Sequence, residues 1–151
     1  MKAEYAKPRD DGDHRSLALW AADCAERVLP YFEGKHPKDD RPRKAIEAAR
    51  AWTRGEIRVG PARVAAVSAH AAARDADDAA ARAAARAAGQ AVATAHMAAH
   101  APHAAAYAVK AVTHAAVSTD AASATAAERD WQYRHLPEHL RHLVFPAGGG
   151  A

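Results

Sequence analysis

Three histidines, His96, His100 and His103, have the spacing in this sequence that is closest to that of a metal site. Histidines four residues apart share one side of a helix, and zinc accepts such a pair when a third ligand and an open position complete the site. The zinc-protease pattern requires a glutamate directly after the first histidine, but Met97 stands there. No acidic residue lies between residues 82 and 119. We therefore expect no metal and no cofactor, and a metal-dependent helical-bundle hydrolase that uses His96 and His100 is the alternative function.

The sequence contains no motif for nucleophilic catalysis. Its single cysteine, Cys24, excludes an intrachain disulfide. Cys24 falls on the apolar side of a predicted helix, where burial makes a thiol unreactive, so we interpret it as a packed side chain. The serines at 16, 68, 118 and 123 lack a catalytic motif, and the only run of glycines is 148–150. We therefore expect a protein that is not an enzyme.

A predicted helix that follows Asp39 carries a dense set of charges. Its start has the pattern of a helix N-terminus, with a capping aspartate and a proline in the first turn. One interpretation of the charges is a solvated face with the ion pairs Asp40–Lys44 and Arg43–Glu47, each worth roughly a few tenths of a kcal/mol. The other interpretation is a partner-binding surface. Its candidate residues are Asp39, Arg41, Arg43, Glu47, Arg50 and Arg54.

The two aspartates at the start of this helix exceed what one cap needs. A helix N-terminus favours one carboxylate, so the second is free to hold Arg41 or Arg43 within the protein, or to meet a partner. Asp40 fits a structural role at the cap. Arg50 and Arg54 lie further along the helix and fit a partner-binding role.

Helices must position these residues, because apolar residues recur at helical spacing along most of the chain. Asp13 is a suitable N-cap for a first helix, whose apolar side contains Leu17, Trp20 and Cys24. Pro30 is expected to kink or end this helix. A third helix is expected to begin at residues 59–61, where a proline again falls in the first turn.

The third predicted helix shows larger apolar side chains at helical spacing. Val64, Val67, Ser68 and Ala71 recur at intervals that place them on one side. We expect this side to face inward.

The segment from residue 76 to residue 127 is dominated by alanine and contains only six Asp, Glu, Lys or Arg residues. Alanine has the best helix propensity, and a helix with so little charge on any side is usually buried. We therefore expect two central helices, roughly 78–99 and 102–117, and Gly89 suggests a close helix crossing. The predicted fold is all-α, a single-domain bundle of about six helices around this central alanine-rich pair.

The length of 151 residues fits one domain. We expect a flexible arm over residues 1–12, a helical domain over 13–146 and a disordered tail over 147–151. The net charge is +3, but the basic residues are interleaved with acids, which argues against nucleic-acid binding. No apolar run suits a membrane span or a signal region, so we expect no membrane association and a cytoplasmic protein.

Four segments together resemble a known family of proteins. They are LALWAADCAE (17–26), DDRPRKAIEAARAW (39–52), ATAHMAAH (93–100) and AYAVKAV (106–112). This combination resembles the immunity proteins of bacterial polymorphic toxin systems, in the helical group described as like the fifth immunity type. The resemblance covers about residues 13–145, and its most specific part is the Asp-Asp-Arg-Pro-Arg segment at 39–43.

The resemblance implies an all-helical, single-domain protein without catalytic activity. Such a protein binds a cognate toxin in the producing cell and blocks it. The family offers no catalytic residues to carry over, so none is assigned. The expected partner is a cognate toxin protein, and association into a homo-oligomer is left open.

Overall fold

The structure, a computed structural model, describes residues 10–146, in which the chain forms helices and no strand. In chain order the helices are α1 (Asp11–Glu33), α2 (Arg41–Thr53), α3 (Val59–Asp75), α4 (Ala79–Ala93), η1 (Ala98–His100), α5 (Ala101–Ala115), α6 (Ala121–His135), η2 (Glu138–Leu140) and α7 (Arg141–Val144), where η marks a 3₁₀ helix. The predicted all-α class is confirmed, although the described residues hold seven α-helices where about six were expected. Most of the predicted arm and all of the predicted tail lie outside these residues, and the domain boundaries stay a prediction.

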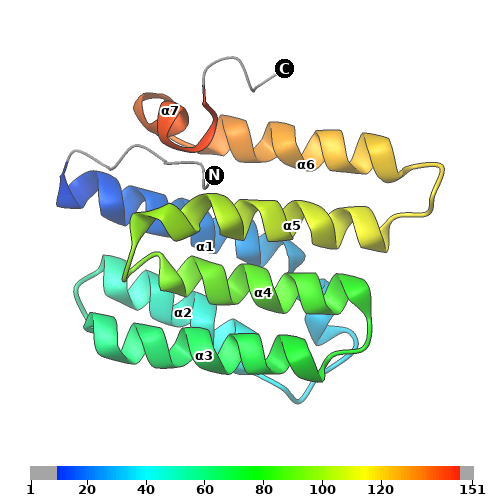
Figure 1. Ribbon diagram of the computed structural model, residues 1–151, viewed down its shortest axis with the longest axis horizontal. Helices are drawn as coiled ribbons and strands as arrows, with labels where there is room; N and C mark the ends of the chain where they lie inside the picture. The colour runs from blue at the N-terminus through cyan, green and yellow to red at the C-terminus, as the bar shows by residue number, and fades with distance from the viewer. Residues whose placement is uncertain (1–9, 147–151) are drawn as a thin grey trace, which may run out of the picture.

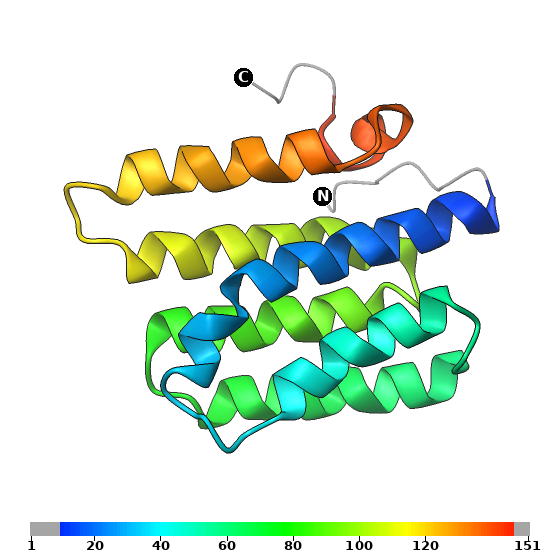
Figure 2. The same ribbon diagram turned by 180° about the vertical axis from the view of Figure 1, so that it is seen from behind.

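The helices are arranged in two layers. Figure 1 shows α6, α5, α4 and α3 side by side in that order, and Figure 2 shows α1 and α2 lying across the other side of this layer. α4 packs against α1, α2, α3 and α5, while α5 packs against α1, α4 and α6. Along the described part of the chain, no helix combines the length and the hydropathy that a membrane span requires.

α1 begins earlier than the sequence predicted and runs past its proline. Asp10 is the N-cap, since its Oδ1 accepts a hydrogen bond from the Asp13 backbone N–H at 2.8 Å. The prediction that Asp13 is the cap is therefore wrong, because Asp13 lies inside the first turn. The helix continues through Pro30 to Glu33, and Figure 2 shows a bend in this last part. The proline bends α1 because it cannot donate a backbone hydrogen bond, but it does not end it.

Trp20 joins α1 to the C-terminal part of the chain. Its side chain is 2% exposed, and its Nε1–H donates a hydrogen bond to the carbonyl oxygen of Gln132 on α6 at 2.9 Å. The ring of Phe145 meets the indole edge-on, with 6.3 Å between centroids. The predicted burial of Leu17, Trp20 and Cys24 on one side of α1 is confirmed.

A buried ion pair adds a second connection between α1 and α6. Glu128 is 4% exposed, and both of its carboxylate oxygens accept hydrogen bonds from Nε of Arg27, at 2.7 and 3.0 Å. The Arg27 guanidinium also lies 4.1 Å from the centroid of the Trp131 ring. Because a buried carboxylate is costly unless it is paired, this arginine is what allows Glu128 to face the core.

Gly89 marks the close contact between α4 and α3. A Cβ added at Gly89 would lie 2.7 Å from Cε1 of His70 on α3. The imidazole of His70 therefore occupies the space that a side chain at position 89 would need. The expectation of a close helix crossing at Gly89 is confirmed.

The predicted inner side of α3 is wrong. The buried residues of this helix are alanines, at 62, 66, 69, 72 and 73. Val64 and Val67 are each 67% exposed, and Ser68 and Ala71 are only partly buried. The reason is steric: α3 packs closely against α2 and α4, and the contact admits alanine more readily than the branched valines.

α4 is shorter than the sequence predicted. It starts near residue 78 as predicted, and the Asp78 carboxylate caps it by accepting a hydrogen bond from the Ala81 backbone N–H at 2.9 Å. It ends at Ala93 rather than near residue 99, and Thr94 turns its hydroxyl back onto the Gln90 carbonyl oxygen at 3.0 Å. The residues that follow form a turn and then η1. The predicted histidine pair in this region therefore does not share one side of a continuous helix.

The Trp20→Ala variant should be strongly destabilised. Removal of the indole leaves a cavity between α1, α6 and Phe145 and removes the hydrogen bond to Gln132, so the free energy of unfolding should fall by roughly 3–5 kcal/mol. Urea denaturation measures this change. The neighbouring Leu19, which is 45% exposed, is the control, because its substitution by alanine should change stability by less than about 0.5 kcal/mol. Similar values for the two variants would show that the buried side of α1 is assigned wrongly.

The Gly89→Ala substitution should depend on His70. Alanine in a helix interior is more favourable than glycine by about 0.8–1.0 kcal/mol. In the native protein the new methyl group meets the His70 ring, so we expect this gain to be lost. In a His70→Ala background we expect the gain to be recovered. A double-mutant cycle of unfolding free energies measures the coupling, and an absence of coupling would contradict the contact.

Candidate functional site

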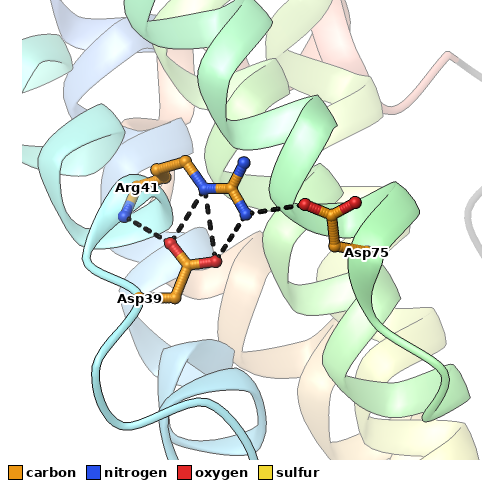
Figure 3. A network of polar contacts seen from close by, with 3 residues as sticks. All are labelled: Asp39, Arg41 and Asp75. Carbon is orange, nitrogen blue, oxygen red and sulfur yellow. Dashed lines mark hydrogen bonds and ion pairs between the residues drawn. The ribbon is translucent and has the colours of Figure 1, made fainter.

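The candidate surface is the α2 charged face, defined as Asp39, Arg41, Arg43, Glu47, Arg50 and Arg54. At its start Asp39 and Arg41 form a network with Asp75 at the end of α3, as Figure 3 shows. The Arg41 guanidinium donates from Nε and Nη2 to Asp39, with a shortest distance of 2.7 Å, and from Nη2 to Asp75 at 3.0 Å. The Arg41 backbone N–H also donates to Asp39 at 3.1 Å. The network therefore fixes the loop before α2 and joins the start of α2 to the end of α3.

The next two arginines of the α2 charged face bind acids of α1. Arg43 forms a two-point ion pair with Glu33, at 2.7 Å from Nε and 2.6 Å from Nη2. Arg50 donates to Asp23 at 2.8 Å and to both oxygens of Glu26 at 2.9 and 3.1 Å. The arginine stripe of α2 therefore lies against an acidic stripe of α1.

The last residues of the α2 charged face are the more exposed ones. Arg54 pairs with Glu56 in the turn after α2, at 2.9 and 3.0 Å, and both side chains are 56% exposed. The predicted pair of Asp40 with Lys44 is present at 3.1 Å. Arg43, however, binds Glu33 and not the expected Glu47. Glu47 is exposed. The pKa of Arg43 is raised mainly by its hydrogen bonds to Glu33 and by the charge of Glu33, and the charge of Glu47 has a smaller effect in the same direction.

These ion pairs shift the protonation of the acids that take part in them. The hydrogen bonds from Arg41 lower the pKa of Asp39, and those from Arg43 lower the pKa of Glu33. Hydrogen bonds from Arg50 likewise lower the pKa of Glu26. Each carboxylate therefore stays ionised to a lower pH than usual, and the pairs persist at neutral pH. Because they are partly exposed, each contributes roughly 0–1 kcal/mol to stability.

Two exposed arginines of the α2 charged face are already held in place by acids of the same chain. Arg43 and Arg54 each bind their carboxylate through Nε and Nη2. Their Nη1 groups are not used in these pairs, and an arginine fork can bind a second carboxylate. A partner would therefore meet guanidinium groups whose side-chain freedom is already reduced, which lowers the entropic cost of binding.

The three histidines of the alternative metal site are neighbours, but they do not form a metal-site group within the described residues. His96 is exposed in the turn after α4, and the Nδ1–H of His100 in η1 donates a hydrogen bond to Oε1 of Gln90 at 2.8 Å. The rings of His100 and His103 are 6.4 Å apart. No group of three or more histidine, cysteine or acidic side chains with the geometry of a metal site occurs within residues 10–146.

His70 is the residue of chemical interest that the sequence analysis missed. Its ring packs on Gly89, and its Nδ1 is buried without a hydrogen-bond partner. Burial lowers the pKa of His70, and the positive charges of Arg86, Arg74 and His100 lower it further. Burial also lowers the pKa of His100, together with its histidine neighbours. The only sequence feature that pointed to this site was Gly89. It predicted a close contact between helices, but it did not identify His70 as the residue in contact.

Cys24 has the environment that its position predicted. It is fully buried on α1. Burial raises the pKa of its thiol, and the negative charges of Glu128 and Asp23 raise it further. The thiolate form needed for nucleophilic chemistry is therefore disfavoured at neutral pH.

Stability should fall as the pH decreases from about 7 to 5. The lowered pKa values of His70 and His100 mean that the unfolded chain binds protons more readily than the folded one, so stability is present above the ordinary histidine pKa of about 6.5 and is lost below it. The paired carboxylates change the stability only at lower pH, where they become protonated. Thermal melting across this range should show a smaller decrease for His70→Asn than for the wild type, with exposed His142→Asn as the control. Equal decreases in all three proteins would contradict the assignment.

One protein family matches most of the chain. Residues 8–139 match the family described as "Imm-5 like putative immunity protein", in agreement with the resemblance noted in the sequence. No curated protein and no solved structure matched. The matched segment runs from before α1 to η2 and includes the whole α2 charged face. The chain therefore belongs to the family of Imm-5 like immunity proteins.

Proposed function

We propose that this protein binds a cognate toxin domain and blocks it without catalysing a reaction. The observation that carries the proposal is the membership of the chain in an immunity-protein family. The fold is consistent with it: the cysteine is buried, and within residues 10–146 the histidines that suggested a metal site do not form a group with metal-site geometry. An immunity protein acts where its toxin is made, so the site of action would be the cytoplasm of the producing cell.

Within this function, the α2 charged face is the proposed toxin-binding surface. Arg43 and Arg54 are its most exposed arginines, with side-chain exposures of 49% and 56%. Both are held by acids of the same chain and keep an unused Nη1 group. Exposed charges of this kind steer the encounter of two proteins and select the correct partner more than they add to affinity.

Arg50 has a different role within the same face. Its side chain is 24% exposed and is bound by Asp23 and Glu26. Reversal of its charge would place three carboxylates together, so an Arg50 variant would combine a change in binding with a change in stability. Arg43 and Arg54 therefore give the cleaner test of the surface.

The double variant Arg43→Gln with Arg54→Gln should fold normally and bind its toxin more weakly. Because exposed ion pairs contribute about 0–1 kcal/mol each, the melting temperature should change little. The dissociation constant for the cognate toxin domain should rise by about tenfold or more, a change of at least roughly 1.4 kcal/mol. Most of the loss should appear in the association rate at low salt.

Titration calorimetry and stopped-flow mixing measure these quantities. Arg129→Gln is the matched control, because Arg129 is an exposed arginine on α6 outside this face. An affinity equal to that of the wild type would remove the α2 charged face from the interface. A large decrease in melting temperature would show that the arginines serve the fold. Wild-type protein that does not bind the toxin domain would overturn the proposed function itself.

A further inference from the structure

The outer face of α3 is apolar and has no helix packed against it. We define the α3 outer face as Val64, Val67 and Ala71, with Arg63 and Arg74 beside them. The spacings of three and four residues place the three apolar side chains in one row, opposite the buried alanines of the helix. Val64 and Val67 are each 67% exposed and are the most exposed large apolar side chains of the described residues. Figure 1 shows α3 at the edge of its layer, with α4 as its only neighbour there.

Two positive charges lie beside this row, and the nearby carboxylate of Asp75 at the end of α3 is bound by Arg41 rather than by them. Arg63 and Arg74 are exposed, and they form no ion pair within residues 10–146. Arg86 of α4 and Arg74 both act on His70, which places their charges on the flank of α3 that faces α4. This arrangement contrasts with α2, where Arg41, Arg43, Arg50 and Arg54 are all bound by acids of the same chain.

We propose that the α3 outer face docks a protein surface that is apolar at its centre and acidic at its edge. This inference rests on the proposed function, under which the docked surface belongs to the toxin domain. Protein interfaces combine an apolar, desolvated centre with a polar rim, and arginine is enriched in them. Val64 and Val67 form the centre, and Arg63 and Arg74 form the rim that meets the partner's carboxylates.

The positive flank argues against a second copy of this chain as the occupant. In a two-fold symmetric contact the same surface meets itself. Such a contact, centred on the valines, would bring each copy's unneutralised arginines to the same interface. Like charges at an interface disfavour association, so the face complements an acidic partner better than it complements itself.

Nucleic acid fits the face less well than an acidic protein. Affinity for nucleic acid comes mainly from many phosphate contacts along a basic stripe. Here the centre of the face is occupied by valines, whose side chains have no charge and no hydrogen-bond donor for a phosphate. The few arginines lie on one flank, and Asp75 is close in sequence at the end of the helix.

The test uses two double variants of the full chain. Val64→Gln with Val67→Gln removes the apolar centre and places a better helix former than valine at both positions. Arg63→Gln with Arg74→Gln removes the positive rim. The control is Val117→Gln, because Val117 is similarly exposed, at 65%, but lies between α5 and α6. The probes are the cognate toxin domain and a duplex DNA of random sequence. The oligomeric state is followed by sedimentation.

We expect the valine variant to bind the toxin domain at least about tenfold more weakly, chiefly through faster dissociation. The arginine variant should associate more slowly and show a weaker dependence on salt. The control should bind like the wild type, and circular dichroism should show that all variants are folded.

Four outcomes would overturn the inference. Wild-type affinity in both variants would overturn it while leaving the proposed function intact. Salt-dependent DNA binding that the arginine variant loses would identify nucleic acid as the occupant. A wild-type dimer that the valine variant loses would identify a second copy. An absence of toxin binding by the wild type would remove the proposed function and this inference with it.

Discussion

The close approach of alanine-lined helices is the constraint on which this fold depends. Large apolar side chains are few, so the core is filled mainly by backbones that lie near one another. α4 shows this close packing most clearly, because it packs against four helices and buries Gly89 and most of its alanines. The consequences reach other elements. α3 must turn its alanines inward and its valines outward, and the His70 ring fills the space that glycine leaves.

The sequence predicted the features that follow from local chemistry. Helix starts with a proline in the first turn were placed correctly at α2 and α3, and the predicted start of α4 near residue 78 was also right. The prediction of which side of α3 faces the core failed because it relied on the rule that the larger apolar residues of a helix face the core. Here the distance between helices decided the question instead. The prediction of where α4 ends failed because alanine, which favours a helix, occurs on both sides of Ala93. The hydrogen bond between His14 and the Thr94 carbonyl oxygen could not be foreseen either, because it comes from a distant part of the sequence.

The candidate site shows the same division between local and distant partners. An aspartate that holds an arginine at the start of α2 could be foreseen, and Asp39 does hold Arg41. The acids that bind the other arginines could not be assigned without the fold. Asp23, Glu26 and Glu33 do recur at helical spacing, so an acidic stripe on the first helix was readable in the sequence. Nothing local indicated that it would face the arginines of α2.

The contacts between α1 and α6 have a consequence for synthesis of the chain. The hydrogen bond of Trp20 and the ion pair of Arg27 join residues separated by 112 and 101 positions. A nascent chain therefore carries α1 while α2 to α5 are synthesised, before its partners on α6 have been made. Truncation before α6 leaves the indole of Trp20 without its cover. These two connections to α1 are thus completed only when the chain has been made through α6, and a product that ends before α6 lacks both of them.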